Sequence, residues 1–252
     1  MCRIAYNQGM PNTNIPISTR TKRIVVFGGG TVMHVRNHMA LCAPAYGGTA
    51  KKLANMLSSN GYRVDLMLTK MAQSTSGLET NDDVKTALMN VLAESSTVGI
   101  VFNVALCDFY GQIGLVAPGK YAERLQTREV TKGGLALTLH PTEKLLALVH
   151  QLRPDIVSVG FKTTANEAKA VQVEKSNRMA REAGVSWMLA NDTVTRNNIV
   201  LRGSHMVAPY APRTIKEAFY NGSDRDQALQ TLAHQFLKNI DDNEAPKRFS
   251  AV

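Results

Sequence analysis

The sequence predicts an α/β protein, a three-layer Rossmann-like sandwich with a mostly parallel sheet and a late β-hairpin. Three observations support this fold class. The β-branched run 23–27 ends in glycines and leads through a helical pattern into a second apolar run. The continuous apolar run 97–105 is typical of a central strand that is buried on both faces. Strand and helix patterns alternate along the chain as far as residue 240.

The segment 49–60 is expected to form the first helix. Its apolar residues recur at helical spacing, and Gly61 follows at the position where helices often stop. The run 63–68 is the next expected strand. Together with the strand at 23–27 it completes a βαβ unit, and such units build parallel sheets.

The middle of the chain contains another helix and strand, followed by a long irregular segment. Residues 81–94 are expected to form a helix that begins at Asn81 or Asp82, because both residue types are favoured N-caps. The strand 97–105 follows. Residues 111–132 are polar and irregular, and a loop of this length is usually functional or mobile.

The second half continues the alternation. The expected elements are a strand at 135–139, a helix at 143–152, a strand at 155–161, a helix at 165–183 and a strand at 186–189. The runs 198–202 and 205–208 are interpreted as the late hairpin. Residues 224–240 are expected to form the C-terminal helix, with Asp224 as its N-cap.

This organisation predicts one domain, residues 23–240, between a flexible extension (1–22) and a flexible tail (241–252). No stretch reaches the roughly 18 continuous apolar residues of a membrane span, and the N-terminus lacks the apolar core of a signal peptide. The three cysteines are widely spaced and do not indicate a disulfide framework. We therefore expect a cytoplasmic protein that does not bind a membrane.

The net charge of +9 is compatible with nucleic-acid binding or with anionic small molecules. Lysine and arginine are dispersed, with no basic run interleaved with aromatic residues. This distribution argues against a nucleic-acid partner and favours a phosphorylated small molecule.

A glycine-rich turn, Gly28-Gly29-Gly30-Thr31, follows the first strand. Glycines let the backbone approach a phosphate closely, and the backbone N–H groups then serve as donors. A purely structural turn is the alternative, because neither a G-x-x-x-x-G-K-[ST] nor a G-x-G-x-x-G spacing is present. The missing second spacing also argues against a nicotinamide-dependent oxidoreductase, although Asp65 ends a second strand where a ribose-binding acid would sit.

Four segments occur in a particular order. They are the glycine turn with the later Gly47-Gly48, the segment 104–110 (VALCDFY), the segment 159–164 (VGFKTT) and the segment 189–192 (LAND). This ordered set resembles phosphopantothenoylcysteine synthetase, the ligase of the coenzyme A pathway, over residues 23–239. The resemblance implies a homodimeric ligase that forms a C–N bond. Enzymes of that family activate the carboxylate of phosphopantothenate with CTP or ATP and Mg²⁺, and cysteine then attacks the acyl-nucleotide.

The resemblance also implies roles for individual residues. The phosphate-binding residues would be Gly28, Gly29, Gly30, Thr31, Gly47 and Gly48. The residues that hold the rest of the nucleotide would be Phe161, Lys162 and Asn191, and Lys144 matches a lysine found before the next helix. Asp108 would bind Mg²⁺ or orient the substrate. Arg128 is the nearest equivalent of the lysine-containing lid.

Two departures from the family pattern keep other functions open. Ala43 occupies the position of the family's substrate-contacting Asn, and Thr163-Thr164 follow Lys162 where the family has a Glu. A methyl group cannot hydrogen-bond a carbonyl oxygen, so a non-catalytic nucleotide-binding module is one alternative.

The second alternative is a divergent enzyme on the same scaffold. His34, Arg36 and His38 follow the glycine turn and would share one face if the segment is extended. They would then be placed to bind the phosphate of another substrate, to act as general acid or base, or to hold a metal.

Overall fold

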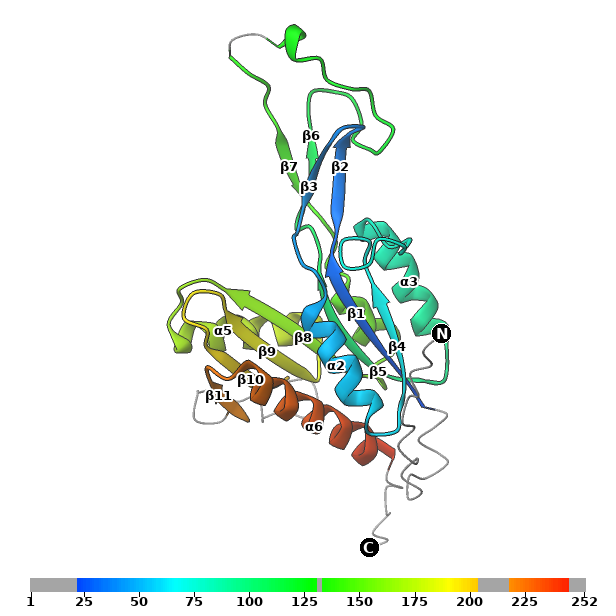
Figure 1. The fold of residues 1–252 in the computed structure, drawn as a ribbon, viewed down its shortest axis with the longest axis vertical. Helices are drawn as coiled ribbons and strands as arrows, with labels where there is room; N and C mark the ends of the chain where they lie inside the picture. Colours follow the sequence, from blue (N-terminus) through cyan, green and yellow to red (C-terminus); the bar gives the residue numbers. More distant parts are fainter. Residues whose placement is uncertain (1–21, 131–132, 204–217, 245–252) are drawn as a thin grey trace, which may run out of the picture.

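The computed structural model describes residues 22–130, 133–203 and 218–244 (Figure 1). At its centre is a seven-stranded sheet with the order β11-β10-β9-β8-β5-β1-β4. The strands are β1 (Arg23–Gly30), β4 (Arg63–Leu68), β5 (Thr97–Ala105), β8 (Val157–Thr164), β9 (Trp187–Asp192), β10 (Asn198–Arg202) and β11 (Tyr220–Gly222). All neighbours from β4 to β9 run parallel, whereas β10 pairs antiparallel with both β9 and β11.

Helices cover both faces of this sheet and give it two separate cores. The helices are α2 (Gly48–Ser58), α3 (Asn81–Ala93), α4 (Leu146–Leu152), α5 (Lys169–Ala183) and α6 (Arg225–Glu244). Ile24 and Val26 of β1 pack in the core under α2 and α6, and Val25 and Phe27 pack in the core under α3, α4 and α5. This alternation follows the two-residue period of a strand. The predicted three-layer α/β sandwich is confirmed.

Two small antiparallel pairs extend from the sheet as one projection, which we call the arm (Figure 1). The first pair is β2 (Val32–Arg36) with β3 (Met39–Cys42), and the second is β6 (Phe109–Gln112) with β7 (Thr138–Pro141). The described residues between β6 and β7, including the 3₁₀ helix η1 (Thr127–Glu129), complete the arm. The segment expected to be an irregular loop therefore begins within a strand, and the strand expected at 135–139 starts at Thr138.

The start of α3 differs from the prediction. Its N-cap is Thr80, whose hydroxyl accepts a hydrogen bond from the backbone N–H of Asp83, while the Asp83 carboxylate accepts from the N–H of Thr80. This capping box satisfies two backbone donors at once and prevails over a cap at Asn81 or Asp82. The Asn81 side chain is buried instead and binds the hydroxyl of Thr31.

The remaining boundaries follow the prediction closely at the C-terminus. Asp224 caps α6 as expected, because its carboxylate accepts hydrogen bonds from the N–H groups of Asp226 and Gln227. The late hairpin is confirmed as β10 with β11, whereas its expected second strand, 205–208, lies outside the described residues. Helix α6 continues beyond residue 240 to Glu244. The predicted extension and tail lie largely outside the described residues, which exclude 1–21 and 245–252. No described helix is long and apolar enough to cross a membrane.

Candidate functional site

Two cavities open where the parallel strands end, beside the base of the arm. The glycine-loop cavity has a volume of about 790 Å³ and is lined by Gly29 at the end of β1, the segment 43–47 before α2, the start of α2 and the ends of β5, β8 and β9. The arm cavity has a volume of about 770 Å³ and lies between β2 and the start of α3. Both are lined by Thr142, Glu143 and Leu145, so the two cavities are neighbours. Ligands of open α/β sheets bind at this edge.

The three glycines predicted to form a turn after the first strand are instead the last residues of β1, where they pair with β5, and they have different roles. Gly29 lines the glycine-loop cavity and has a φ of 100°, a backbone conformation that side chains disfavour. Gly28 and Gly30 do not line it; they let other segments pack against the end of β1. A Cβ on Gly28 would lie 2.2 Å from the Cβ of Ala50, and a Cβ on Gly30 would lie 1.9 Å from the carbonyl oxygen of Ala43. Of the four residues predicted to hold phosphate, Gly28 to Thr31, the structure places only Gly29 against the cavity.

The start of α2 forms one wall of the glycine-loop cavity and is open to an anion. Its N-cap, Gly47, offers no side-chain acceptor, and its first turn contains no acidic residue. In the described part of the chain, the N–H groups of Gly48, Thr49 and Ala50 have no hydrogen-bond acceptor. Free N–H groups and the positive end of the helix dipole together favour a bound anion such as phosphate.

The charged side chains of this cavity leave an excess of positive charge. Lys144 pairs with Asp108 at 2.5 Å, and both side chains are well exposed at the cavity mouth. Lys175 pairs with Glu167. Among the described residues, three further cations of the lining, Lys162, Arg178 and Arg225, have no ion pair, whereas Glu182 is the only carboxylate of the lining without one. A cavity with this balance suits a polyanionic ligand.

The glycine-loop cavity brings together most of the residues that the sequence predicted from distant segments. Those that line it are Gly29, Gly47, Gly48, Asp108, Lys144, Phe161, Lys162 and Asn191. The aromatic ring of Phe161 supplies an apolar surface beside the charged residues. The side-chain oxygen of Asn191 accepts a hydrogen bond from the hydroxyl of Thr163 at 3.3 Å. The roles of these residues in binding stay predictions.

The structure does not bring His34, Arg36 and His38 together. A β-bulge at Val35 breaks the alternation, because His34 pairs with Ala40 while Arg36 pairs with Met39. The Arg36 guanidinium is buried and donates to the carbonyl oxygens of Ile113 and Val35 at 2.5 and 2.7 Å. His38 is exposed in the turn that follows. The shared face expected for an extended segment is therefore absent.

Arg128 lies far from both cavities. It belongs to η1, which Figure 1 shows at the far end of the arm, and its side chain is exposed. It lines neither cavity. A role over the ligand stays a prediction, and it would require the arm to bend or the arm of a second copy to approach.

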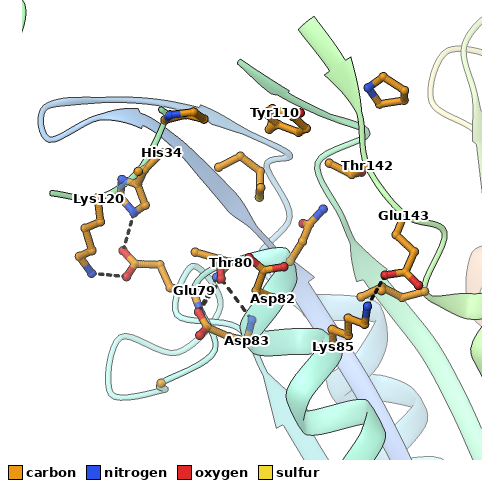
Figure 2. Close-up of a pocket in the computed structure, with 17 residues that line it drawn as sticks. His34, Glu79, Thr80, Asp82, Asp83, Lys85, Tyr110, Lys120, Thr142 and Glu143 are labelled. Atoms are coloured by element: carbon orange, nitrogen blue, oxygen red, sulfur yellow. Dashed lines mark hydrogen bonds and ion pairs between the residues drawn. The ribbon is translucent and has the colours of Figure 1, made fainter. Parts of the chain in front are cut away.

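His34 lines the arm cavity, where the charges pair with one another (Figure 2). Glu79 lies between Lys120, at 2.5 Å, and His34, at 3.7 Å. The hydrogen bond from Lys120 holds the pKa of Glu79 below its usual value. Lys85 pairs with Glu143 at the other side of this cavity. The arm cavity thus lacks the excess positive charge of its neighbour.

Sequence reasoning missed three cations of the glycine-loop cavity, which are Lys175 and Arg178 of α5 and Arg225 of α6. Their helices reach the cavity only through the three-dimensional fold. For Arg225 a local signal existed, because it directly follows the N-cap Asp224. A cation in the first turn of a helix opposes the helix dipole, so such a residue often has another function.

No protein-family model and no curated protein sequence matches this chain. Solved structures do match. The DNA/pantothenate metabolism flavoprotein from Streptococcus pneumoniae has a TM-score of 0.66 and 17% identity over 88% of this chain and 99% of its own. The C-terminal domain of the coenzyme A biosynthesis bifunctional protein CoaBC has a TM-score of 0.59 and 16% identity over 89% of this chain and 96% of its own.

A third structure is a Cab2 variant in complex with phosphopantothenate-cysteine. Its TM-score is 0.59, with 16% identity over 89% of this chain and 88% of its own. Identities this low establish the fold alone. The resemblance that the four sequence segments indicated is confirmed at that level: the chain has the fold of these pantothenate and coenzyme A proteins.

Proposed function

We propose that the chain is a nucleotide-dependent ligase of coenzyme A biosynthesis that joins the carboxylate of phosphopantothenate to the amine of cysteine. The observation that carries the proposal is the glycine-loop cavity, a positively charged cavity in which residues predicted from four separate segments meet. The fold adds support, because a protein of the same fold is solved with phosphopantothenate-cysteine.

In this proposal the start of α2, with Gly29, Gly47 and Gly48, binds the phosphates of CTP or ATP. Phe161 packs against the base or the ribose, and Lys162 faces the phosphates. A carboxylate oxygen of phosphopantothenate attacks the α-phosphorus, and pyrophosphate leaves. The cysteine amine then attacks the acyl carbon, and the nucleoside monophosphate leaves. Fixed positive charges around the phosphates stabilise the charge that develops on the leaving groups.

Magnesium fits this arrangement only as an ion carried by the nucleotide. Within the described residues, no group of three or more His, Cys, Asp or Glu side chains is placed to hold a metal. Mg²⁺ often uses one or two carboxylates together with substrate phosphates, and there it neutralises phosphate charge. Asp108 would supply one carboxylate, after exchanging its contact with Lys144.

A non-catalytic nucleotide-binding module is the second candidate. Ala43 lines the glycine-loop cavity, and its methyl group offers no hydrogen bond to an acyl substrate. A chain of this kind would keep the phosphate site and lack turnover.

Pyrophosphate release separates the two candidates. We expect the purified protein with Mg²⁺ and CTP or ATP to release pyrophosphate only when phosphopantothenate is present. Lys162→Met should lower kcat/KM about 10- to 100-fold, because it removes a charge-assisted contact. Lys52→Met, which removes an exposed cation paired with Asp226, is the control. Nucleotide binding without any release would replace the ligase with the binding module.

We also propose that the chain forms a homodimer through the arm. Most of the large apolar side chains that the described structure leaves exposed lie on the arm: Phe109, Leu115, Val116, Tyr121, Leu135, Leu137 and Leu139. Apolar side chains gathered on one projection are typical of a protein interface. A second copy is the expected partner because it carries the same apolar projection, and symmetric dimers pair identical surfaces.

Sedimentation analysis tests the dimer. We expect the wild-type chain to sediment as a dimer and the double variant Leu135→Glu/Leu139→Glu as a monomer with nearly unchanged Tm. Leu152→Glu places one such charge at an equally exposed leucine away from the arm and should remain dimeric. A monomeric wild type, or a dimeric double variant, would contradict the proposal.

A further inference from the structure

Arg225 reaches from the start of α6 to the start of α2. Its guanidinium donates hydrogen bonds to the side-chain oxygen of Asn198 at 2.9 Å and to the hydroxyl of Thr49 at 3.2 Å. Thr49 lies in the first turn of α2, and both Thr49 and Arg225 line the glycine-loop cavity. Three secondary-structure elements therefore fix this side chain at the wall of the cavity.

The positive charge of Arg225 has no ion-pair partner among the described residues, and the nearby charge of Asp226 opposes only part of the effect of burial on its pKa. Its acceptors, Asn198 and Thr49, are neutral, and no described carboxylate forms an ion pair with it. The adjacent carboxylate of Asp226 pairs with Lys52 instead. Burial lowers the pKa of the guanidinium from its usual value, as expected when a charge is removed from water.

The surroundings add further positive potential. Arg225 is the first residue of α6 and lies beside the first turn of α2, so it is close to the positive ends of two helix dipoles. A half-buried cation among such dipoles is unfavourable unless an anion compensates it. A role limited to joining α2, α6 and β10 would not require a charge, because an uncharged donor could bond the same two oxygens.

We propose that Arg225 is a phosphate-binding residue, which contacts a phosphate group of the ligand held at the start of α2. A guanidinium has five N–H donors, and two hydrogen bonds to Asn198 and Thr49 leave donors for a phosphate oxygen. Arginine binds phosphate well because its planar fork matches two oxygens at once. The inference rests on the proposed function and deepens it. The phosphate comes either from the nucleotide or from phosphopantothenate.

Calorimetric binding to the full chain tests the inference with four probes: inorganic tripolyphosphate, CTP, ATP and phosphopantothenate. We expect Arg225→Met to lower the affinity for at least one of the probes that the wild type binds, by about 10- to 100-fold. Arg225→Lys keeps the charge and loses the planar fork of N–H donors, so its affinity for that probe should lie between those of the wild type and Arg225→Met. Lys238→Met removes an exposed cation of α6 that lines neither cavity and should bind like the wild type.

Thermal stability distinguishes phosphate binding from a structural role. Without ligand, Arg225→Met should unfold at the same temperature as the wild type or higher, since an uncompensated charge is removed. The rise in Tm that the bound probe causes should shrink in the variant. A variant with lower Tm and unchanged affinity would show a structural role and overturn the inference.

The outcomes separate this inference from the proposed function. The inference is supported if Arg225→Met lowers the affinity for a probe, and the identity of that probe shows which molecule supplies the phosphate. A loss of less than threefold for every probe, or a wild type that binds none of them, overturns it. If CTP and ATP do not bind but another probe does, with dependence on Arg225, then the ligase proposal fails and the inference stands. If Arg225→Met does not fold, Arg225→Lys is judged by the same threefold limit.

Discussion

Replacing Gly30 with alanine is expected to destabilise the fold by about 3 kcal/mol and to abolish ligand binding in the glycine-loop cavity. The added Cβ would lie 1.9 Å from the carbonyl oxygen of Ala43 and 2.7 Å from the backbone nitrogen of Ala45. Both are backbone atoms, so a change of rotamer cannot relieve the overlap. Ala43 and Ala45 also line the cavity, and the segment must therefore move together with its wall.

Gly48 provides the matched control for this substitution. A Cβ on Gly48 would meet no atom within 4 Å, and Gly48 is the first residue of α2. Gly48→Ala should therefore be neutral or stabilise the fold by up to about 1 kcal/mol, because alanine favours the helix. Urea unfolding measures both variants. Equal free energies of unfolding for Gly30→Ala and the wild type would contradict the prediction, because they would show that the Ala43–Ala45 segment moves away from the added methyl group at no cost.

The strands nearest the site were predictable because local pattern decides them. The runs 63–68 and 97–105 coincide with β4 and β5, since short β-branched and apolar runs between polar turns leave little choice of structure. The arm was not predictable in this way. Strand β6 pairs with β7 across a long polar segment, and Phe109 meets Pro141. Only tertiary contacts select such a distant pair.

The candidate site also contains residues that the sequence predicts and residues whose position depends on tertiary packing. Asp108, Phe161, Lys162 and Asn191, which the resemblance implied as site residues, meet because they lie in the last part of parallel strands or just after them, and such ends share one edge of the sheet. Arg225 lies on a helix, and its position depends on how α6 packs. The prediction that His34, Arg36 and His38 share one face is wrong for a different reason, because one bulge residue reverses the face of the side chains beyond it.

The second large effect is expected at Asp192, the last residue of β9. Its carboxylate is almost fully buried and accepts hydrogen bonds from the N–H groups of Asn166, Glu167, Val194 and Thr195, at 2.8 to 3.0 Å. The loop after β8 is thereby joined to the loop after β9. Asp192→Ala should leave these donors without an acceptor and lower the Tm more than removal of any exposed carboxylate. Asp82→Asn, at an exposed position, is the control.

The same carboxylate predicts how stability depends on pH. Desolvation raises its pKa, but the hydrogen bonds from Glu167, Thr195, Thr164 and Asn166 outweigh this effect and hold the pKa of Asp192 well below its usual value. A depressed pKa stabilises the fold fully above the unfolded-state value of about 3.9, and this stability is lost as the pH falls further. Asp192→Asn cannot titrate. The difference in free energy of unfolding between wild type and this variant should therefore be constant near neutral pH and shrink below about pH 4.

Urea unfolding at about pH 7 and about pH 3 measures that difference directly. A difference of equal size at both values would contradict the assignment of Asp192 as a hydrogen-bonded carboxylate anion. The loops that it joins flank Lys162 and Asn191 in the glycine-loop cavity. Asp192→Asn should therefore also weaken ligand binding at neutral pH, where the fold is intact, because the ends of β8 and β9 lose the anion that fixes their spacing.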